Sequence, residues 1–211
     1  PTGWIMPEED QKSLVEFARE KNIWLISDEV YHSLVFDRPV ATSMLNFAGS
    51  DDKVIVVNSF SKSWAMTGWR LGWMIIPEGL INIFEKLNEF NVASPSSPAQ
   101  YAGVVAINEG EKFIDKMIQN LKISRAIALN NLNDFSRVIF PYSQAAFYAY
   151  FKIKDISDSE KFCFDTLKST SVGLAPGTSF GNGGNSWIRI CYAKSPDLLN
   201  KAFEKLKPVL S

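Results

Sequence analysis

The chain has 211 residues, of which 46% are hydrophobic and 21% are charged, and its formal net charge is −1. This balance is ordinary for a globular protein and excludes a strongly basic nucleic-acid-binding surface. No apolar run approaches the roughly 20 residues that a membrane-spanning helix needs, so we expect neither nucleic acid nor membrane as a partner.

The first part of the chain combines helix and strand patterns. Pro7 precedes three acidic residues, which is typical of a helix start because proline suits the first turn and acids favour the positive end of the helix dipole. We expect this helix over residues 8–21 and short buried strands over 23–27, 53–59 and 70–76. Continuous apolar strands with a helix between them predict an α/β fold whose sheet is covered on both faces.

The second part of the chain changes from helices to a mixed pattern. Helices are expected over 78–90, 97–108 and 111–134, and the last is long enough to connect two domains. From about residue 135 the pattern is α+β, with strands over 137–140 and 145–153, a helix over 158–170, a strand, glycine-rich loop and strand over 172–193, and a helix over 196–210. We therefore predict two domains, 1–125 and 126–211.

The cysteines and the histidine show no metal-binding pattern. Cys163 and Cys191 lack the spacing of a metal or redox pair and are predicted to be free, buried thiols in a reducing compartment. His32, the only histidine, has no second histidine or cysteine beside it and is expected to be structural. No metal site is predicted.

Polar side chains follow two of the predicted strands. Asp28 and Tyr31 come after the strand at 23–27, and Ser59, Ser61 and Lys62 come at the end of the strand at 53–59. Ligands of open α/β sheets bind beyond the carboxyl ends of strands, so these groups are candidates for one site. Each also has a plainer interpretation: a cap of the following helix for Asp28, an ordinary half-buried aromatic for Tyr31, a surface lysine for Lys62.

Two arginines stand between apolar residues on both sides, Arg70 and Arg189. A buried guanidinium needs an anionic partner, which could be a protein carboxylate or a ligand phosphate or carboxylate. Together the candidates fit one cofactor. A lysine forms a Schiff base with an aldehyde, a carboxylate keeps a pyridine nitrogen protonated, and arginines with hydroxyls bind phosphate and carboxylate. These are the requirements of pyridoxal 5'-phosphate.

The stretch "SFSKSWAMTGWRLGW" resembles the lysine signature of class I/II aminotransferases, the fold-type-I pyridoxal-phosphate enzymes. In that signature Ser-x-x-Lys is followed by Gly-Trp-Arg-x-Gly. The resemblance extends over the whole chain and includes "PTG", "SDEVYHSLVF", "AAFYAYF", "VGLAPGTSFG" and "WIRICYA". It implies the C-terminal part of the family's large sheet domain, followed by its small α+β domain.

The resemblance also implies roles for the candidate residues in binding the cofactor ring. Lys62 would form the Schiff base and then move a proton between the substrate Cα and the cofactor C4′. Asp28 would pair with the pyridinium nitrogen, and Tyr31 would hydrogen-bond to the ring oxygen O3′.

The remaining candidates would bind anionic groups. By the same resemblance, Ser59 and Arg70 would bind the cofactor phosphate, with Ser61 as a weaker candidate. Arg189 would bind the α-carboxylate of the amino acid or 2-oxo acid. The expected activity is amino-group transfer between an L-amino acid and a 2-oxo acid, by a cytoplasmic homodimer.

The resemblance covers only the C-terminal 55% or so of a family member of ordinary length. The part that precedes "PTG" in the family carries a phosphate-binding helix start, an aromatic that stacks on the ring and a tyrosine contributed across the dimer. We therefore expect the chain to be a fragment that is inactive alone. Two alternatives stay open: another fold-type-I activity, such as a β-lyase or a decarboxylating synthase, and a folded but non-catalytic product that self-associates through its uncovered sheet.

Overall fold

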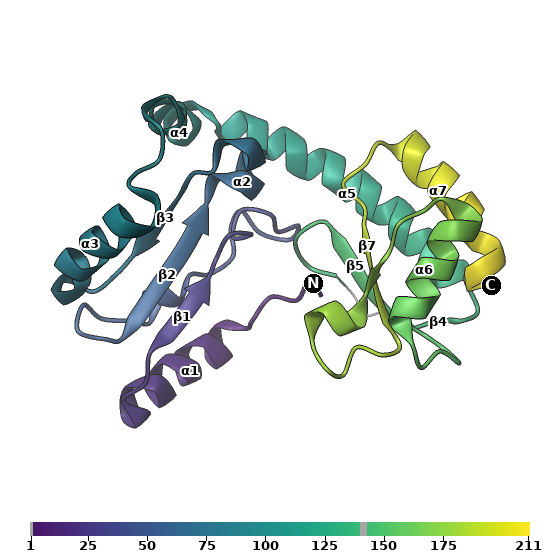
Figure 1. Ribbon diagram of the computed structural model, residues 1–211, viewed down its shortest axis with the longest axis horizontal. Coiled ribbons are helices and arrows are strands. Elements are labelled where there is room, and N and C mark those ends of the chain that lie inside the picture. Colours follow the sequence, from purple (N-terminus) through teal and green to yellow (C-terminus); the bar gives the residue numbers. More distant parts are fainter. Residues whose placement is uncertain (1, 140–142) are drawn as a thin grey trace. The chain divides into compact units, whose positions relative to one another are not determined.

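The computed structural model describes residues 2–139 and 143–211, which form two compact units, each with its own sheet (Figure 1). One unit holds residues 5–116, and the other holds residues 117–211 together with the residues up to Trp4. The chain leaves the first unit within one long helix, α5 (Glu111–Asp134), and the predicted domain boundary after residue 125 falls in the same helix. No helix in the two described ranges is both long and apolar enough to cross a membrane.

The sheet of the first unit has three strands in the order β1-β2-β3. β1 (Leu25–Asp28) pairs in parallel with β2 (Val54–Ser59), and β2 pairs antiparallel with β3 (Gly72–Ile75). All three strands were predicted, with β1 shifted to 25–28 from the expected 23–27 and with β2 and β3 shorter than the expected 53–59 and 70–76.

Helix α1 (Glu8–Lys21) covers one face of this sheet, and its bounds match the predicted helix. It begins directly after Pro7, with acidic residues in its first turn. Val15, almost fully buried, packs in one cluster with Met44, Val54 and Val56. The alternating burial along β2 follows from this contact, because successive side chains of a strand point to opposite faces.

The opposite face of the sheet is open, which corrects the expectation of a sheet covered on both faces. Ile26 of β1 is 66% exposed and Met74 of β3 is 48% exposed. The register places Ile26 beside Ile55 and Met74 beside Val57, so these four apolar side chains share the open face. The strands are apolar on both sides, but the first unit supplies a cover for one side only.

The helices predicted over 78–90 and 97–108 are confirmed as α3 and α4, and the structure adds the short helix α2 and the 3-10 helices η1, η2 and η3. Their bounds are Met44–Asn46 (η1), Phe60–Ser63 (α2), Thr67–Trp69 (η2), Glu78–Leu80 (η3), Ile81–Val92 (α3) and Ser97–Glu109 (α4). None of the residues of α3 is buried, and its Phe90 is 89% exposed. This helix therefore adds to the uncovered apolar surface of the unit.

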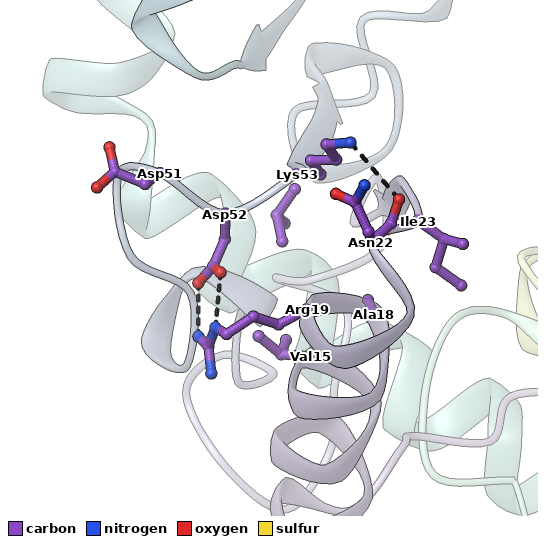
Figure 2. A pocket seen from close by; sticks show the side chains of 9 residues that line it. Val15, Ala18, Arg19, Asn22, Ile23, Asp51, Asp52 and Lys53 are labelled. Atoms are coloured by element: carbon purple, nitrogen blue, oxygen red, sulfur yellow. Dashed lines mark hydrogen bonds and ion pairs between the residues drawn. The ribbon is translucent and has the colours of Figure 1, made fainter.

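An ion pair joins α1 to the loop that precedes β2. Figure 2 shows Arg19 reaching Asp52, with its Nε and Nη2 donating to the two carboxylate oxygens at 2.7 and 2.6 Å. The backbone N–H of Gly49 donates to the same carboxylate at 2.8 Å. The hydrogen bonds from Arg19, and then that from Gly49, lower the pKa of Asp52 to about 2.

We expect Asp52→Asn to reduce the acid sensitivity of this unit. Because the pKa of Asp52 is lowered in the folded state, its stabilising effect is complete above about pH 4 and is lost as the pH falls toward about 2. Urea unfolding at about pH 5 and about pH 3 should therefore show a larger loss of unfolding free energy for the wild-type chain than for the variant. Asp51→Asn, which removes an exposed neighbouring carboxylate, should keep the wild-type loss, and equal losses in all three proteins would contradict the assignment.

The second unit contains an antiparallel sheet with the strand order β4-β5-β7-β6, together with α6, α7 and the greater part of α5 (Figure 1). The bounds are Val138–Ile139 (β4), Tyr148–Ile153 (β5), Ser159–Thr170 (α6), Ala175–Pro176 (β6), Gly177–Phe180 (η4, a 3-10 helix), Trp187–Cys191 (β7) and Pro196–Leu210 (α7). The predicted α+β pattern is confirmed, and residue 140 of the strand expected over 137–140 lies outside the described residues.

One face of this sheet belongs to the core of the unit. The inward side chains of β5 and β7 are at most 4% exposed, and they are Ala149, Phe151, Ile153, Ile188 and Ile190. Helices α5 and α7 contribute the equally buried Leu132, Phe203 and Leu206. The ring of Phe203 lies 6.4 Å from that of Phe135, centroid to centroid.

The start of the chain is bound into the second unit. The carbonyl of Gly3 accepts hydrogen bonds from the backbone N–H groups of Gln144 and Ala145, at 2.8 and 2.9 Å. Gly3 has a φ of 69°, and a Cβ atom there would collide with the hydroxyl of Ser143. Glycine is needed because other residues rarely adopt this conformation and none would fit the contact.

The two cysteines differ in environment, which corrects the prediction that both are buried. Cys163 on α6 is buried, and this burial raises its pKa to about 11. Cys191, the last residue of β7, is exposed because it lies on the sheet face opposite the core.

Candidate active site

The carboxyl ends of β1 and β2 meet at one edge of the sheet because the two strands are parallel. Asp28 is paired with Val57, and the N–H of Glu29 donates to the Val57 carbonyl at 2.9 Å. β2 ends two residues later, at Ser59, and continues directly into helix α2. The residues predicted to form one site therefore leave two neighbouring strands at the same edge.

Lys62 lies on α2, and its amino group faces the ring of Tyr31. The Nζ atom is 5.8 Å from the ring centroid, at the outer limit of a cation–π contact. Ser59 starts the helix by accepting a hydrogen bond from the Ser61 N–H at 3.0 Å. Lys62 is half-buried and makes no ion pair within the described part of the chain. Its amine is thus held near Tyr31 without a carboxylate to neutralise it.

Asp28 is exposed and is only partly engaged. One carboxylate oxygen accepts a hydrogen bond from the Val30 N–H at 3.2 Å, which caps the turn after β1. Glu29, by contrast, binds the protein itself, because its Oε1 accepts from the Met44 N–H and the Ser27 hydroxyl at 2.9 and 3.0 Å. Asp28 and Glu29 thus differ in their contacts, and Asp28 keeps one carboxylate oxygen that can accept a hydrogen bond from a ligand.

Arg70 lies in a turn and is exposed, which corrects the expectation of a buried guanidinium. It follows the 3-10 helix η2 and precedes β3, so its apolar neighbours in sequence do not enclose it. Its Nη1 donates to the Thr67 carbonyl at 3.0 Å. The next residue, Leu71, accepts from the Phe60 N–H at 3.1 Å, which brings the turn against the start of α2.

The loop between Lys62 and Arg70 contains two residues other than glycine in the left-handed region. Ala65 has a φ of 52° and Arg70 a φ of 50°. Such conformations cost roughly 1–2 kcal/mol per residue and cluster at functional sites. Nothing in the residue types of this loop predicts these conformations.

Arg189 lies in the second unit, on β7, and is half-buried. Its Cζ atom is 4.2 Å from the ring centroid of Tyr148 and 4.3 Å from that of Phe180. No carboxylate among residues 2–139 and 143–211 forms an ion pair with it. The sequence left two kinds of partner open for Arg189, a protein carboxylate and a ligand anion. The described residues provide no protein carboxylate for it.

His32 has contacts of the structural kind. Its Nδ1 lies 3.0 Å from the Glu29 carbonyl oxygen and its Nε2 lies 3.0 Å from the Ser33 hydroxyl. Both ring nitrogens are thus occupied within the turn after β1. In the described ranges no three histidine, cysteine or acidic side chains gather as a metal site.

Comparisons with known proteins identify extensive similarity. The profile of the family described as "Aminotransferase class I and II" matches residues 1–206. An aspartate aminotransferase of Pyrococcus abyssi is 32% identical over the whole chain, and an aromatic-amino-acid aminotransferase of Thermococcus litoralis is 30% identical. In both, the match covers 54% of the relative, so the chain spans about half the length of the curated relatives it matches.

Solved structures show the same coverage. The chain superposes over its full length on an aminotransferase from Mycobacterium tuberculosis, with a TM-score of 0.91, 33% identity and 55% of that chain covered. An aromatic aminotransferase from Pyrococcus horikoshii gives a TM-score of 0.93, with 32% identity and 57% of its chain covered. The fold of the described units is therefore shared with these proteins.

Proposed function

Because the chain belongs to the class I and II aminotransferase family, we propose that it carries part of a pyridoxal-phosphate site and serves amino-group transfer between an L-amino acid and a 2-oxo acid. The observation that carries the proposal is the parallel pairing of β1 and β2. It brings Asp28 and the Lys62 helix to one sheet edge, and the lysine amine forms no ion pair with the described residues.

The residues at this edge fit the chemistry of the cofactor. A Schiff base with an aldehyde needs a primary amine. Lys62 offers one beside Tyr31, and no carboxylate of the described residues forms an ion pair with it. A pyridine nitrogen needs a carboxylate with an unused oxygen, which Asp28 has. A phosphate needs several donors, and Ser59 and Ser61 at the start of α2 lie beside the turn that carries Arg70, because the Leu71 carbonyl accepts hydrogen bonds from the Ser59 hydroxyl and the Phe60 N–H.

When bound, the cofactor supplies an aldehyde that condenses with amines and a ring that withdraws electrons from the substrate Cα. The proposed task of Lys62 is to hold the cofactor and to move a proton at that carbon. Asp28 keeps the ring nitrogen protonated by charge, and the Tyr31 hydroxyl orients the ring through O3′. The hydroxyls of Ser59 and Ser61 and the guanidinium of Arg70 anchor the phosphate.

Arg189, in the second unit, is the proposed carboxylate-binding residue. Its guanidinium offers donors in a planar fork that matches a carboxylate, and it forms no ion pair with the described residues. The proposed ligand is the α-carboxylate that amino acids and 2-oxo acids share. This explains why one arginine can serve both half-reactions, because the carboxylate is unchanged when the amino group is replaced by oxygen.

A substrate panel tests the proposed reaction. We would assay the 211-residue chain with pyridoxal phosphate, alone and fused behind the N-terminal part of the Pyrococcus abyssi relative, with amino acids and 2-oxo acids. The fusion should pass the amino group to the 2-oxo acid, and the chain alone should not. Pyruvate and ammonia released without a 2-oxo acid would instead identify the β-lyase alternative.

Assembly and location are further parts of the proposal. We propose a homodimer that acts in the cytoplasm, on the ground of the family resemblance. The open face with Ile26 and Met74 favours association of the chain when it is alone, which is the non-catalytic alternative. Sedimentation of the chain and of the fusion separates the two: a dimeric fusion supports the homodimer, and a monomeric fusion contradicts it.

A further inference from the structure

The second face of the small sheet, opposite the core, is lined by aromatic side chains. Tyr150 is paired with Arg189, and Tyr148 with Cys191, so all four side chains share this face. Trp187 belongs to it as well, because it lies two residues before Arg189 on the same strand. A sheet face that merely met water would carry polar residues at these positions.

Arg189 is held by rings rather than by charge. Tyr148 and Phe180 contact its guanidinium at 4.2 and 4.3 Å, and the described residues offer it neither an ion pair nor a hydrogen bond. An aromatic ring attracts the flat side of a guanidinium, so the N–H donors at the edge remain open. The half-buried Arg189 guanidinium can therefore bind an anion through its free N–H groups.

Phe180 is itself fixed in place by a stack of rings. The Tyr150 ring meets it edge-on at 6.0 Å, and Tyr150 stacks on Trp187 at 5.0 Å with an angle of 10° between the rings. The backbone beneath is close-packed as well, because a Cβ atom on Gly177 or Gly184 would collide with the other glycine. The loop therefore presents Phe180 at a fixed position beside β7.

We propose that Tyr148 and Phe180 are positioning residues, which hold the Arg189 guanidinium for the substrate carboxylate. This inference rests on the proposed function only in taking Arg189 as the carboxylate-binding group. The rings restrict the orientation of the guanidinium and remove water from its faces. The entropic cost of fixing this side chain when the carboxylate binds is therefore lower. In both residues the aromatic ring holds the guanidinium, and the Tyr148 hydroxyl is not needed for this role.

Binding of pyruvate, followed by NMR of the labelled arginine side chains of the 211-residue chain, tests this inference. Pyruvate should shift the Nε–Hε signal of Arg189. Phe180→Leu and Tyr148→Leu, which keep apolar bulk but remove the ring, should each raise the apparent dissociation constant about three- to tenfold. Tyr148→Phe keeps the ring and should bind like the wild type.

Phe164→Leu is the matched control. Phe164 also contacts a cation, because its ring centroid lies 4.3 Å from the Lys168 Nζ, but it is exposed on α6. Its replacement should leave pyruvate binding unchanged, and far-UV circular dichroism should show that all variants stay folded.

Arg189→Lys separates the possible failures. If this variant and both ring variants weaken binding, the inference is supported. If Arg189→Lys weakens binding and the ring variants do not, the positioning role is overturned while the carboxylate role of Arg189 stands. If Arg189→Lys binds pyruvate like the wild type, the positioning role falls together with the carboxylate role, and the proposed cofactor site around Lys62 is untouched.

Discussion

Replacing Lys62 with alanine is expected to abolish the site-specific attachment of pyridoxal phosphate to this chain. Attachment requires a primary amine at the cofactor aldehyde, and alanine has none. After incubation with the cofactor and reduction with borohydride, peptide mapping of the wild-type chain should find most of the label on Lys62. In an active fusion, the same substitution should lower the rate of amino transfer by at least about 10²–10⁴-fold, the usual contribution of a positioned proton-transfer group.

Lys53 provides a matched control at the other end of the same strand. It precedes β2 as Lys62 follows it, and its Nζ lies 5.9 Å from the ring centroid of Trp24, much as Lys62 lies beside Tyr31. Lys53→Ala should leave the label on Lys62 intact. Equal labelling of the two lysines in the wild-type chain would mean that Lys62 reacts as an ordinary surface amine, which contradicts its proposed role.

Phe203→Ala is expected to cause a large loss of stability in the second unit. Phe203 is 1% exposed and its ring contacts that of Phe135, so truncation leaves a cavity between α7 and its neighbours. Buried phenylalanines replaced by alanine typically cost about 3–5 kcal/mol. Hydrogen exchange should become faster throughout β5, β7 and α7, and chemical unfolding of this unit should occur at lower denaturant concentration.

The same substitution at Phe164 tests whether burial is the cause. Phe164 is 57% exposed on α6, and exposed sites usually tolerate replacement within about 0.5 kcal/mol. Phe164→Ala should therefore leave exchange in β5 and β7 near the wild-type rate. If both variants were destabilised equally, the core assignment of Phe203 would be wrong.

The elements of the fold could be predicted because their signals are local. Helix α1 begins where Pro7 and the acidic residues indicate, and strand β2 follows its apolar run. The family could be recognised for the same reason, since the signature around Lys62 is one continuous stretch. The open face of the first sheet was harder to foresee, because the apolar pattern of a strand shows what can be buried and not what covers it.

The surroundings of single side chains were the least predictable. Arg70 was expected to be buried because Trp69 and Leu71 flank it, yet neighbours in sequence do not enclose a residue that sits in a turn. Phe180 could not be predicted because its contact with Arg189 joins the end of η4 to a residue of β7 nine positions later. The only hint was the apolar residue inside the glycine-rich "GTSFGNGGN". The roles of Lys62, Asp28, Tyr31, Ser59, Ser61 and Arg70 stay predictions until the labelling and the assays are done.

The hydrogen bonds of Gly3 have a consequence for the order in which the protein is made. The N–H groups of Gln144 and Ala145 that bind the Gly3 carbonyl are synthesised about 140 residues after Gly3. At about 5–20 residues per second, the carbonyl stays hydrated for roughly 7–28 s. The second unit therefore cannot be completed by its own contiguous segment. One of its contacts is made by a residue that is translated before the whole of the first unit, residues 5–116.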